Sequence, residues 1–254
     1  MQLKSNFFTY LSLVLFTTFL MSFSSILHAK VQANGKEIIE IVVMSDLRKN
    51  TLDAVSTSLQ IIDSESIDRR NAQHLDALLN TAANVNFASG ASRGRFIQIR
   101  GIGERSQFVE PINPSVGVVM DGIDISGMSG AAMTLDLDRV EILRGPQGTI
   151  YGSNALAGLI NLRSNRPTSY ESGSFALGVG NYATSMVDGS YSNALASNSN
   201  FRIAMKKTNS DGFIKNTHLD RKDTNNINEF SLKSMIDWQM TDKLDINSTL
   251  LVVD

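Results

Sequence analysis

Residues 139–162 read RVEILRGPQGTIYGSNALAGLINL, and this stretch decides the fold around it. The apolar runs at 140–143 and 159–162 have the length of short strands. Gly145, Pro146 and Gly148 lie between them, and such residues interrupt regular structure and favour turns. The stretch therefore predicts two short strands joined by a glycine-rich connection.

The same pattern of short apolar runs and glycine-rich turns covers residues 52–167. Further strands are predicted at 59–62, 96–100 and 116–120. Leu75, Leu78 and Leu79 follow helical spacing, which predicts one amphipathic helix over 67–83. A small sheet with one or two helices, an α+β arrangement, is the expected result.

From residue 170 onward, apolar and polar residues alternate in segments of about ten residues. Examples of the apolar positions are Phe201, Ile203 and Met205; Phe230, Leu232, Ile236, Trp238 and Met240; and Leu244, Ile246, Leu250 and Val252. A soluble β-sandwich would give the same alternation. Segment length, and connections that are short at 196–200, long at 210–226 and short again at 241–242, favour strands that cross a membrane. Trp238, beside a short turn, is then expected at the periplasmic aromatic girdle.

The N-terminus indicates export. Lys4 precedes an uncharged, mostly apolar run at 7–27, and small residues follow, which is typical of a secretory signal. Cleavage after Ala29 or after Ala33 fits this pattern. An uncleaved membrane anchor is the alternative, because the run is about long enough to span a bilayer, although its serines and threonines weaken that alternative. No later segment of the sequence has the character of a transmembrane helix.

Composition excludes several classes of protein. The formal charge is −2, which argues against binding to nucleic acid, since that needs a basic surface. The chain has no cysteine, so disulfides and thiolate sites are excluded. Gly101 and Gly103 lack the third glycine of a dinucleotide loop, and the three histidines are isolated in the sequence. We therefore expect no enzyme, no metal site and no cofactor.

The stretch at residues 139–162 resembles the plug domain of TonB-dependent outer-membrane receptors. It contains the family's V-E-x-x-R-G-P, Y-G and A-x-A-G-x-I-N elements in order, at 140–146, 151–152 and 155–161. The segments IRGIG at 99–103 and VVMDGI at 118–123 also resemble the family. One departure is the segment Ala83-Asn84-Val85, where many relatives have Pro-Gly-Val, and this puts the local turn geometry in question.

The resemblance implies an α+β plug domain followed by the start of an antiparallel transmembrane β-barrel, with about five strands of an expected 22. The implied divisions are a signal peptide at 1–29, a TonB-box segment at 30–50, the plug domain at 51–167 and the N-terminal part of the barrel at 168–254. The implied location is the outer membrane of a Gram-negative bacterium. The implied role is energy-coupled uptake of a scarce small ligand, most often a ferric siderophore, with a TonB-type protein as partner.

The resemblance also implies site residues. The TonB-binding segment would be Glu40, Ile41, Val42, Val43, Met44 and Ser45, acting as an added strand on the partner's sheet edge. Plug–barrel contacts would come from Arg100, Glu141 and Arg144, since buried charges need partners. Ligand contacts would come from outward plug loops, with Arg93, Gln107, Phe108 and Met128 as candidates.

The 87 residues after Pro167 suffice for about five strands. Because unpaired backbone groups are not tolerated in lipid, we hypothesise a truncated receptor. A split receptor completed by another chain is one alternative. A soluble periplasmic plug-like module that binds a ligand or the TonB partner is another.

Overall fold

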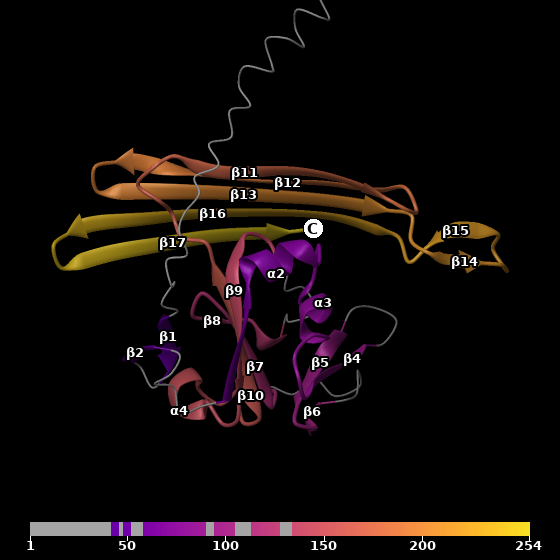
Figure 1. Ribbon diagram of the computed structural model, residues 1–254, viewed down its shortest axis with the longest axis horizontal. Coiled ribbons are helices and arrows are strands. Elements are labelled where there is room, and N and C mark those ends of the chain that lie inside the picture. Colours follow the sequence, from indigo (N-terminus) through magenta and orange to yellow (C-terminus); the bar gives the residue numbers. More distant parts are fainter. Residues whose placement is uncertain (1–41, 46–47, 52–57, 90–93, 105–112, 128–133) are drawn as a thin grey trace, which may run out of the picture. The chain divides into compact units, whose positions relative to one another are not determined.

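The computed structural model describes residues 42–45, 48–51, 58–89, 94–104, 113–127 and 134–254. Strands predominate among these residues, and three short helices accompany them (Figure 1). The described residues between 58 and 167 form the plug region, and the long strands that follow form the wall sheet.

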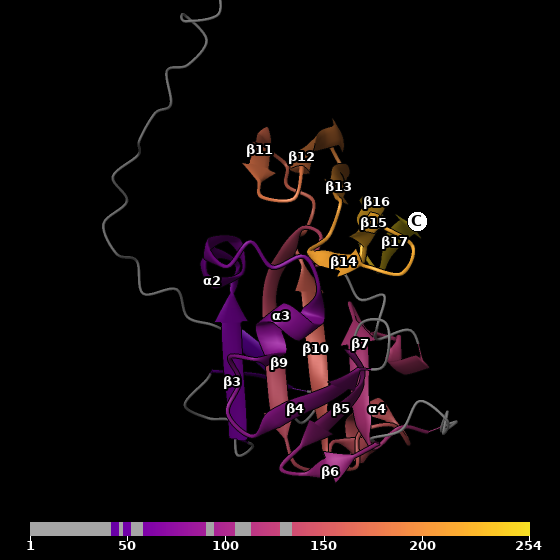
Figure 2. The ribbon, with the colours of Figure 1, turned by 90° about the vertical axis from the view of Figure 1, so that its right-hand side faces the viewer.

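A five-stranded sheet organises the plug region (Figure 2). Its order is β3 (Ser58–Asp63), β9 (Leu137–Arg144), β10 (Gly158–Ser164), β7 (Val116–Met120) and β8 (Ile123–Asp124). Strands β9 and β10 are antiparallel, with Leu143 opposite Leu159, whereas β10 and β7 are parallel. The two strands predicted from the opening stretch are thus confirmed as β9 and β10, in the middle of this sheet.

Glycines in and near the opening stretch have two different tasks. Gly145, with φ of 111°, lies in the connection that leads to helix α4 (Gly148–Tyr151), where a turn is required. Gly158 instead begins β10, and a Cβ there would lie 2.5 Å from the carbonyl oxygen of Leu143 and 2.6 Å from Cδ1 of Ile99. Close packing, in addition to turn formation, therefore requires glycine in this motif.

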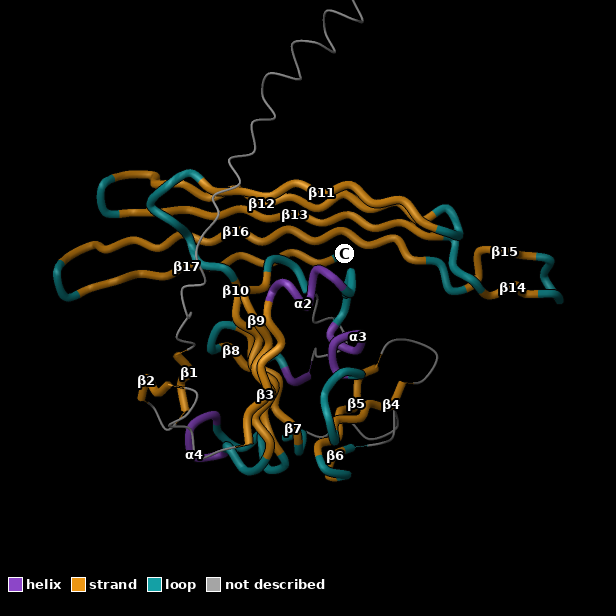
Figure 3. The backbone as a smooth tube through the Cα atoms, in the orientation of Figure 1, coloured by secondary structure: helices purple, strands orange, loops and turns teal. Residues whose placement is uncertain are grey.

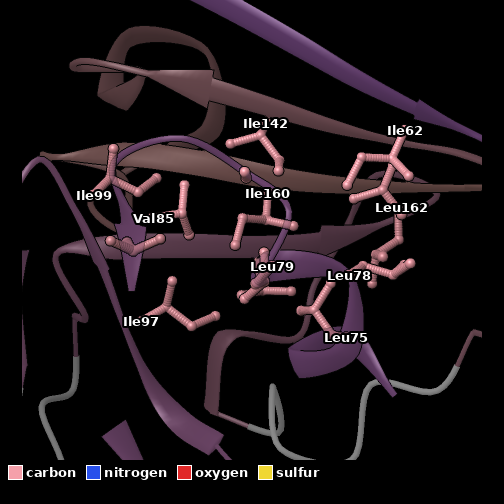
Figure 4. Packing of buried hydrophobic residues seen from close by; sticks show 14 of the residues in the cluster. Ile62, Leu75, Leu78, Leu79, Val85, Ile97, Ile99, Ile142, Ile160 and Leu162 are labelled. Carbon is pink, nitrogen blue, oxygen red and sulfur yellow. The ribbon is translucent and has the colours of Figure 1, made fainter. Parts of the chain in front are cut away.

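One face of the five-stranded sheet carries the main hydrophobic core (Figure 4). A three-stranded sheet contributes to it, formed by β4 (Val85–Ser89), β5 (Gly94–Ile99) and β6 (Ile102–Gly103). Two helices, α2 (Ser64–Arg69) and α3 (Leu75–Leu79), supply the rest of the cover. Core residues from these elements include Leu75, Leu78, Leu79, Val85, Ile97, Ile99, Ile142, Ile160 and Leu162.

The prediction of one helix over 67–83 is wrong, because the chain forms α2 and α3 with a break between them. The side chain of Asp63 caps α2, and its hydrogen bonds with Ser66 lower the pKa of Asp63. Asn71 adopts a left-handed conformation with φ of 46°. The chain after it is held by Thr134, whose N–H donates to the carbonyl of Gln73 and whose hydroxyl donates to that of Ala72. This tertiary contact prevents the helix from continuing.

The segment that departs from the family pattern forms a turn of its own. Asn84 has φ of 60°, a conformation that asparagine adopts more readily than most residues. Its carbonyl accepts a hydrogen bond from the N–H of Arg100 at 2.8 Å. The turn between α3 and β4 is therefore built on an asparagine.

The wall sheet consists of five long antiparallel strands (Figure 3). They are β11 (Ser172–Gly180), β12 (Thr184–Ala196), β13 (Ser199–Ser210), β16 (Ile227–Thr241) and β17 (Leu244–Val253), paired in that order. The long connection before β16 carries a small hairpin of β14 (Ile214–Asn216) and β15 (Arg221–Thr224). Plug region and wall sheet belong to one compact unit, Val42–Asp254.

Leu78 provides a direct test of the core. Its side chain is 0% exposed, so the Leu78→Ala substitution removes buried methyl groups and leaves a cavity. We expect a loss of about 2–5 kcal/mol in the free energy of unfolding. The control is Leu156→Ala, because Leu156 is 66% exposed. The free energy of unfolding of both variants is measured by urea unfolding, and hydrogen exchange at the amides of β10 gives a second measure. An equal loss of stability in the two variants would contradict the assigned core.

Candidate functional site: the plug–wall contacts

The wall sheet has a polar and an apolar face, and the polar face is the buried one. Thr208, Ser231 and Lys233 are each at most 2% exposed. On the opposite face, Ile203 and Met205 are 43% and 42% exposed. A soluble one-sided sheet shows the reverse distribution, with its apolar face packed on the core. Buried polar side chains need polar partners, and several of those on this sheet have them in the plug region.

The main contact between the two parts is an ion pair between Arg202 on β13 and Asp136, which immediately precedes β9. Nε of Arg202 donates to Oδ2 of Asp136 at 2.6 Å, and Nη2 donates to Oδ1 at 2.5 Å. Both side chains are largely buried, at 11% and 6% exposed. Two parallel hydrogen bonds between a guanidinium and a carboxylate combine strength with fixed geometry.

Asp136 is itself fixed from within the plug region. Its φ of 52° lies in the left-handed region. Nδ2 of Asn165 donates to its Oδ1 at 2.8 Å, and the N–H of Asn165 donates to its carbonyl at 3.1 Å. The turn before β9 and the end of β10 therefore present Asp136 as a rigid acceptor.

Lys233 on β16 makes the second contact. Its ammonium donates to the carbonyl oxygen of Leu135 at 2.8 Å and to Oγ of Ser164 at 2.7 Å. Ser164 in turn donates its N–H to Oδ1 of Asp121 at 2.9 Å. We call Asp136, Ser164, Arg202 and Lys233 the anchor cluster, because these residues join the plug region to two adjacent wall strands.

A third contact joins His74, which precedes α3, to Glu229 on β16. Nε2 of His74 lies 2.8 Å from Oε2 of Glu229, and the two side chains are 12% and 10% exposed. His74 adjoins the segment that Thr134 holds. The wall sheet thus contacts the plug region at residues 135–136 and also next to the segment that Thr134 holds.

A polar cavity of about 560 Å³ lies beside the anchor cluster. Asp68 from the plug region and Asp188 from β12 are among the charged residues that line it, and small residues of β11, such as Ser174 and Ala176, line the wall side. Nζ of Lys206 lies 3.7 Å from Oδ2 of Asp188. Hydrophilic groups of both parts therefore share this space.

Arg100 and Arg144, two of the residues expected to contact the barrel, lie close together in the plug region. Nε of Arg144 donates to the carbonyl of Ala83 at 3.0 Å, and Nη2 donates to Oε1 of Gln60. Partial burial, and then the charge of Arg100, lower the pKa of Arg144. Arg100 is exposed and has φ of 56°. A role for either residue in contact with a barrel wall stays a prediction.

Glu141, the third expected contact residue, is 1% exposed and lies on the sheet face opposite the main core. Oε1 accepts from Nε of Arg139 and Oε2 accepts from Nδ2 of Asn161, both at 2.8 Å, and Nε of Arg163 lies 4.0 Å from Oε2. Burial disfavours the charge of Arg139, but hydrogen bonds and attraction from Glu141 and Asp138 outweigh it and raise the pKa of Arg139. These contacts belong to the plug region, and a further contact of Glu141 with a barrel stays a prediction.

Several predicted site residues lie outside the described residues, namely Glu40, Ile41, Arg93, Gln107, Phe108 and Met128. Of the expected TonB-binding segment, Val42–Ser45 form strand β1, which pairs antiparallel with β2 (Arg48–Thr51). An extended backbone suits the expected role of this segment, and the role itself stays a prediction.

The anchor cluster was not predicted from the sequence. Arg202 and Lys233 occupy polar positions of alternating strands, and a charge in the middle of such a strand signals a buried partner. Asp136 carries no comparable signal, since it lies in an irregular stretch far from both cations in the sequence.

Across the described part of the chain, no three histidine or acidic side chains lie close enough to hold a metal ion. Within the same residues, no helix combines the length and apolarity needed to cross a bilayer.

Comparison with known proteins adds an independent line of evidence. Residues 51–159 match the family model of the TonB-dependent receptor plug domain. The vitamin B12 transporter BtuB of Vibrio vulnificus is 27% identical over 196 residues, covering 74% of this chain and 30% of that protein. The pesticin receptor of Yersinia pestis is 28% identical over 140 residues, covering 55% of this chain and 20% of that receptor.

Solved structures show the same fold. The ferric yersiniabactin uptake receptor FyuA from Yersinia pestis aligns with a TM-score of 0.67 at 20% identity, covering 75% of this chain and 30% of that receptor. The alcaligin outer-membrane receptor FauA from Bordetella pertussis aligns with a TM-score of 0.66 at 15% identity, covering 84% of this chain and 34% of that receptor. This chain spans 30% or less of the length of the two sequence relatives named above. The plug-domain match at residues 51–159, the antiparallel strands after it and the similar receptors named above all point to the family of TonB-dependent receptors.

Proposed function

We propose that this chain serves in TonB-dependent uptake of a scarce small ligand across the outer membrane of a Gram-negative bacterium. The observation that carries the proposal is the anchor cluster, which holds a plug region against strands whose other face is apolar and exposed. A plug that closes a wide barrel must be held by the wall and must also be able to change its contacts. Hydrogen bonds and ion pairs suit this task, because polar groups can exchange protein partners for water.

A ferric siderophore is the ligand that we propose. Support comes from similar proteins, which include the ferrioxamine receptor of Yersinia enterocolitica and the ferric yersiniabactin receptor. The vitamin B12 transporter among the relatives makes cobalamin the second ligand to test. Arg93, Gln107, Phe108 and Met128 remain our candidates for ligand contact.

The proposed partner is a TonB-type energy-coupling protein that binds residues 40–45. Four of these residues form the short strand β1, paired only with β2 among the described residues. A strand in a two-stranded sheet keeps one edge open for a further strand. We keep the divisions at 1–29, 30–50, 51–167 and 168–254 as part of this proposal, with an N-terminal signal for export.

The exposed apolar face of the wall sheet argues against the alternative of a soluble periplasmic module. Phe175, Leu177 and Val179 on β11 are 71%, 70% and 93% exposed, and similar residues continue across the sheet. Contiguous apolar surface of this extent marks a contact with a membrane or another protein. We therefore favour an outer-membrane location.

Cell fractionation and ligand binding test the proposal together. We expect the chain, expressed with its own N-terminus, in the outer-membrane fraction, and we expect binding of at least one compound from a panel of ferric siderophores and cobalamin. Binding is measured by calorimetry on the detergent-solubilised chain. Recovery as a soluble periplasmic protein would contradict the proposed location, whereas membrane recovery without binding to any panel member would contradict the proposed ligand classes.

The TonB segment is tested by Val43→Pro. Proline removes a backbone donor and resists pairing in a central strand, so we expect the affinity of the chain for the periplasmic domain of a TonB protein to fall by roughly tenfold, the cost of about one lost hydrogen bond. Val43→Ala keeps the backbone donor and serves as the control. Equal affinities of the two variants, measured by calorimetry, would argue against strand addition at this segment.

The anchor cluster is tested by Arg202→Ala. This change leaves the carboxylate of Asp136 buried without its main partner, which costs about 3–5 kcal/mol for buried pairs. We expect faster hydrogen exchange at residues 134–137 and a lower urea midpoint. Lys215→Ala is the control, because Lys215 and Asp220 form an exposed pair, with side chains 55% and 89% accessible. If both variants behave alike, Arg202 does not hold the plug region.

A further inference from the structure

The contact between His74 and Glu229 differs in kind from the anchor cluster, which also joins the plug region to the wall sheet. Imidazole is the side chain whose charge ordinarily changes between about pH 5 and about pH 8. The anchor cluster consists of aspartate, serine, arginine and lysine side chains. Of these contacts between plug region and wall sheet, the one at His74 is therefore the one that a change of pH near neutrality addresses.

The geometry of this contact makes it depend on the proton of the imidazole. Nε2 of His74 lies 2.8 Å from Oε2 of Glu229, which is an ion pair when the imidazole is protonated. The two side chains are 12% and 10% exposed, so little water screens their charges. When the imidazole is neutral, the carboxylate loses this counter-charge but stays in the same surroundings, and buried charges are costly without their partners.

The local structure of the plug region directs the imidazole at the wall sheet. His74 is the N-cap residue of α3, with an extended backbone at φ of −133° and ψ of 160°. Residues at this position commonly cap the helix with their side chains, but the side chain of His74 makes no such hydrogen bond. The residue before it is fixed, because the carbonyl of Gln73 accepts from the N–H of Thr134. The backbone is thus held while the side chain contacts β16.

On the wall side, Glu229 belongs to the same face of β16 as Lys233 of the anchor cluster. Alternation along the strand places Glu229, Ser231 and Lys233 on this face, and each of them is buried. Four residues separate Glu229 from Lys233, which is about 13 Å along a strand. Strand β16 therefore holds the plug region at two levels, through Lys233 at one and through Glu229 at the other.

The elements around this contact carry other charged groups, none of them an imidazole. These groups are Asp68 on α2, Asp76 on α3, Asp136 before β9, Asp188 on β12, Arg202 and Lys206 on β13, Lys233 on β16 and Asp254 after β17. Lys206 lies opposite Ser231 in the register, two residues from the position opposite Glu229, and it is paired with Asp188 at 3.7 Å. Asp136 is paired with Arg202. A change of pH near neutrality therefore acts on this contact through His74.

We propose that His74 and Glu229 form a pH-sensitive latch between the plug region and β16. The latch is an ion pair while His74 carries its proton, and it weakens as rising pH removes that proton. In stronger acid it weakens again, because carboxylates take up protons there. The plug region is thus held at two levels of β16 in mildly acidic surroundings and through the anchor cluster alone in alkaline ones. This inference goes beyond the proposed function, since it depends on no particular ligand.

Hydrogen exchange at the amides of α3 tests the latch in the detergent-solubilised chain. Protection factors, which correct for the intrinsic pH dependence of exchange, are measured between about pH 5.5 and about pH 8. We expect the protection of Leu75–Leu79 to fall by roughly tenfold as the pH rises, on the scale of one hydrogen bond to a charged group. The amides of β10, which belong to the part held by the anchor cluster, serve as the internal reference and should keep their protection.

Two variants remove the ion pair from either side. His74→Gln and Glu229→Gln each delete one charge and keep a polar side chain, so we expect the protection of α3 to become independent of pH in both. His218→Gln is the matched control, because His218 is exposed on the connection between β14 and β15. This control variant should retain the pH dependence of the unmodified chain.

A double-mutant cycle with His74→Gln and Glu229→Gln isolates the pair itself. The coupling between the two positions should be present at about pH 6 and lost at about pH 8. If one single variant loses the protection of β10, and hence the fold, the other variant decides alone, since each removes the ion pair. Protection of α3 that is independent of pH in the unmodified chain would overturn the latch. A pH dependence that persists in the folded variants, or that His218→Gln abolishes, would overturn it as well.

Discussion

The ion pair between Arg202 and Asp136 is the interaction on which the rest of the described structure depends. Each partner is largely buried, so each would carry an uncompensated charge without the other. The pair is also geometrically fixed, because Asn165 and a left-handed backbone hold Asp136 in place. Lys233 donates one hydrogen bond to the carbonyl of Leu135, the residue before Asp136, and another to Ser164, the last residue of β10. Two wall strands thereby hold one turn of the plug region.

This interaction explains the unusual distribution of polarity in the wall sheet. Lys233 is buried because the plug region supplies acceptors for its ammonium, whereas the buried Lys206 faces Asp188 on the neighbouring wall strand β12. The same strands leave Ile203 and Met205 exposed. A sheet of this kind is stable only when polar partners cover one face and an apolar medium covers the other. The plug-domain match and the anchor cluster agree with each other on this point.

Much of the fold could be predicted from the sequence, because short apolar runs between glycines identify the plug strands. Strand β7 has the predicted bounds, and β9 and β10 extend only a few residues beyond theirs. The helix prediction failed at Asn71, where contacts with Thr134 decide the conformation. Such a contact between distant residues leaves no periodic signal in the sequence.

The site was harder to predict for a related reason. Arg202 and Lys233 can be recognised as charges on the polar side of alternating strands, but Asp136 lies in an irregular stretch. Glu141 shows the converse. Its partner Arg139 is two residues away on the same strand, so strand periodicity alone places the two side chains on one face. A local partner of this charge was therefore within reach of sequence reasoning, unlike the partner of Arg202.

The large sequence separations within the anchor cluster have a consequence for the order of folding. Lys233 reaches a carbonyl 98 residues earlier, whereas β9 and β10 form one antiparallel pair joined by a short connection. Local pairings form readily, and distant ones must wait until the chain segments between them are ordered. The plug sheet is thus expected to form ahead of its attachment to the wall strands. Until that attachment, the ammonium group of Lys233 needs water, and hydration of the inner face is a condition for assembly.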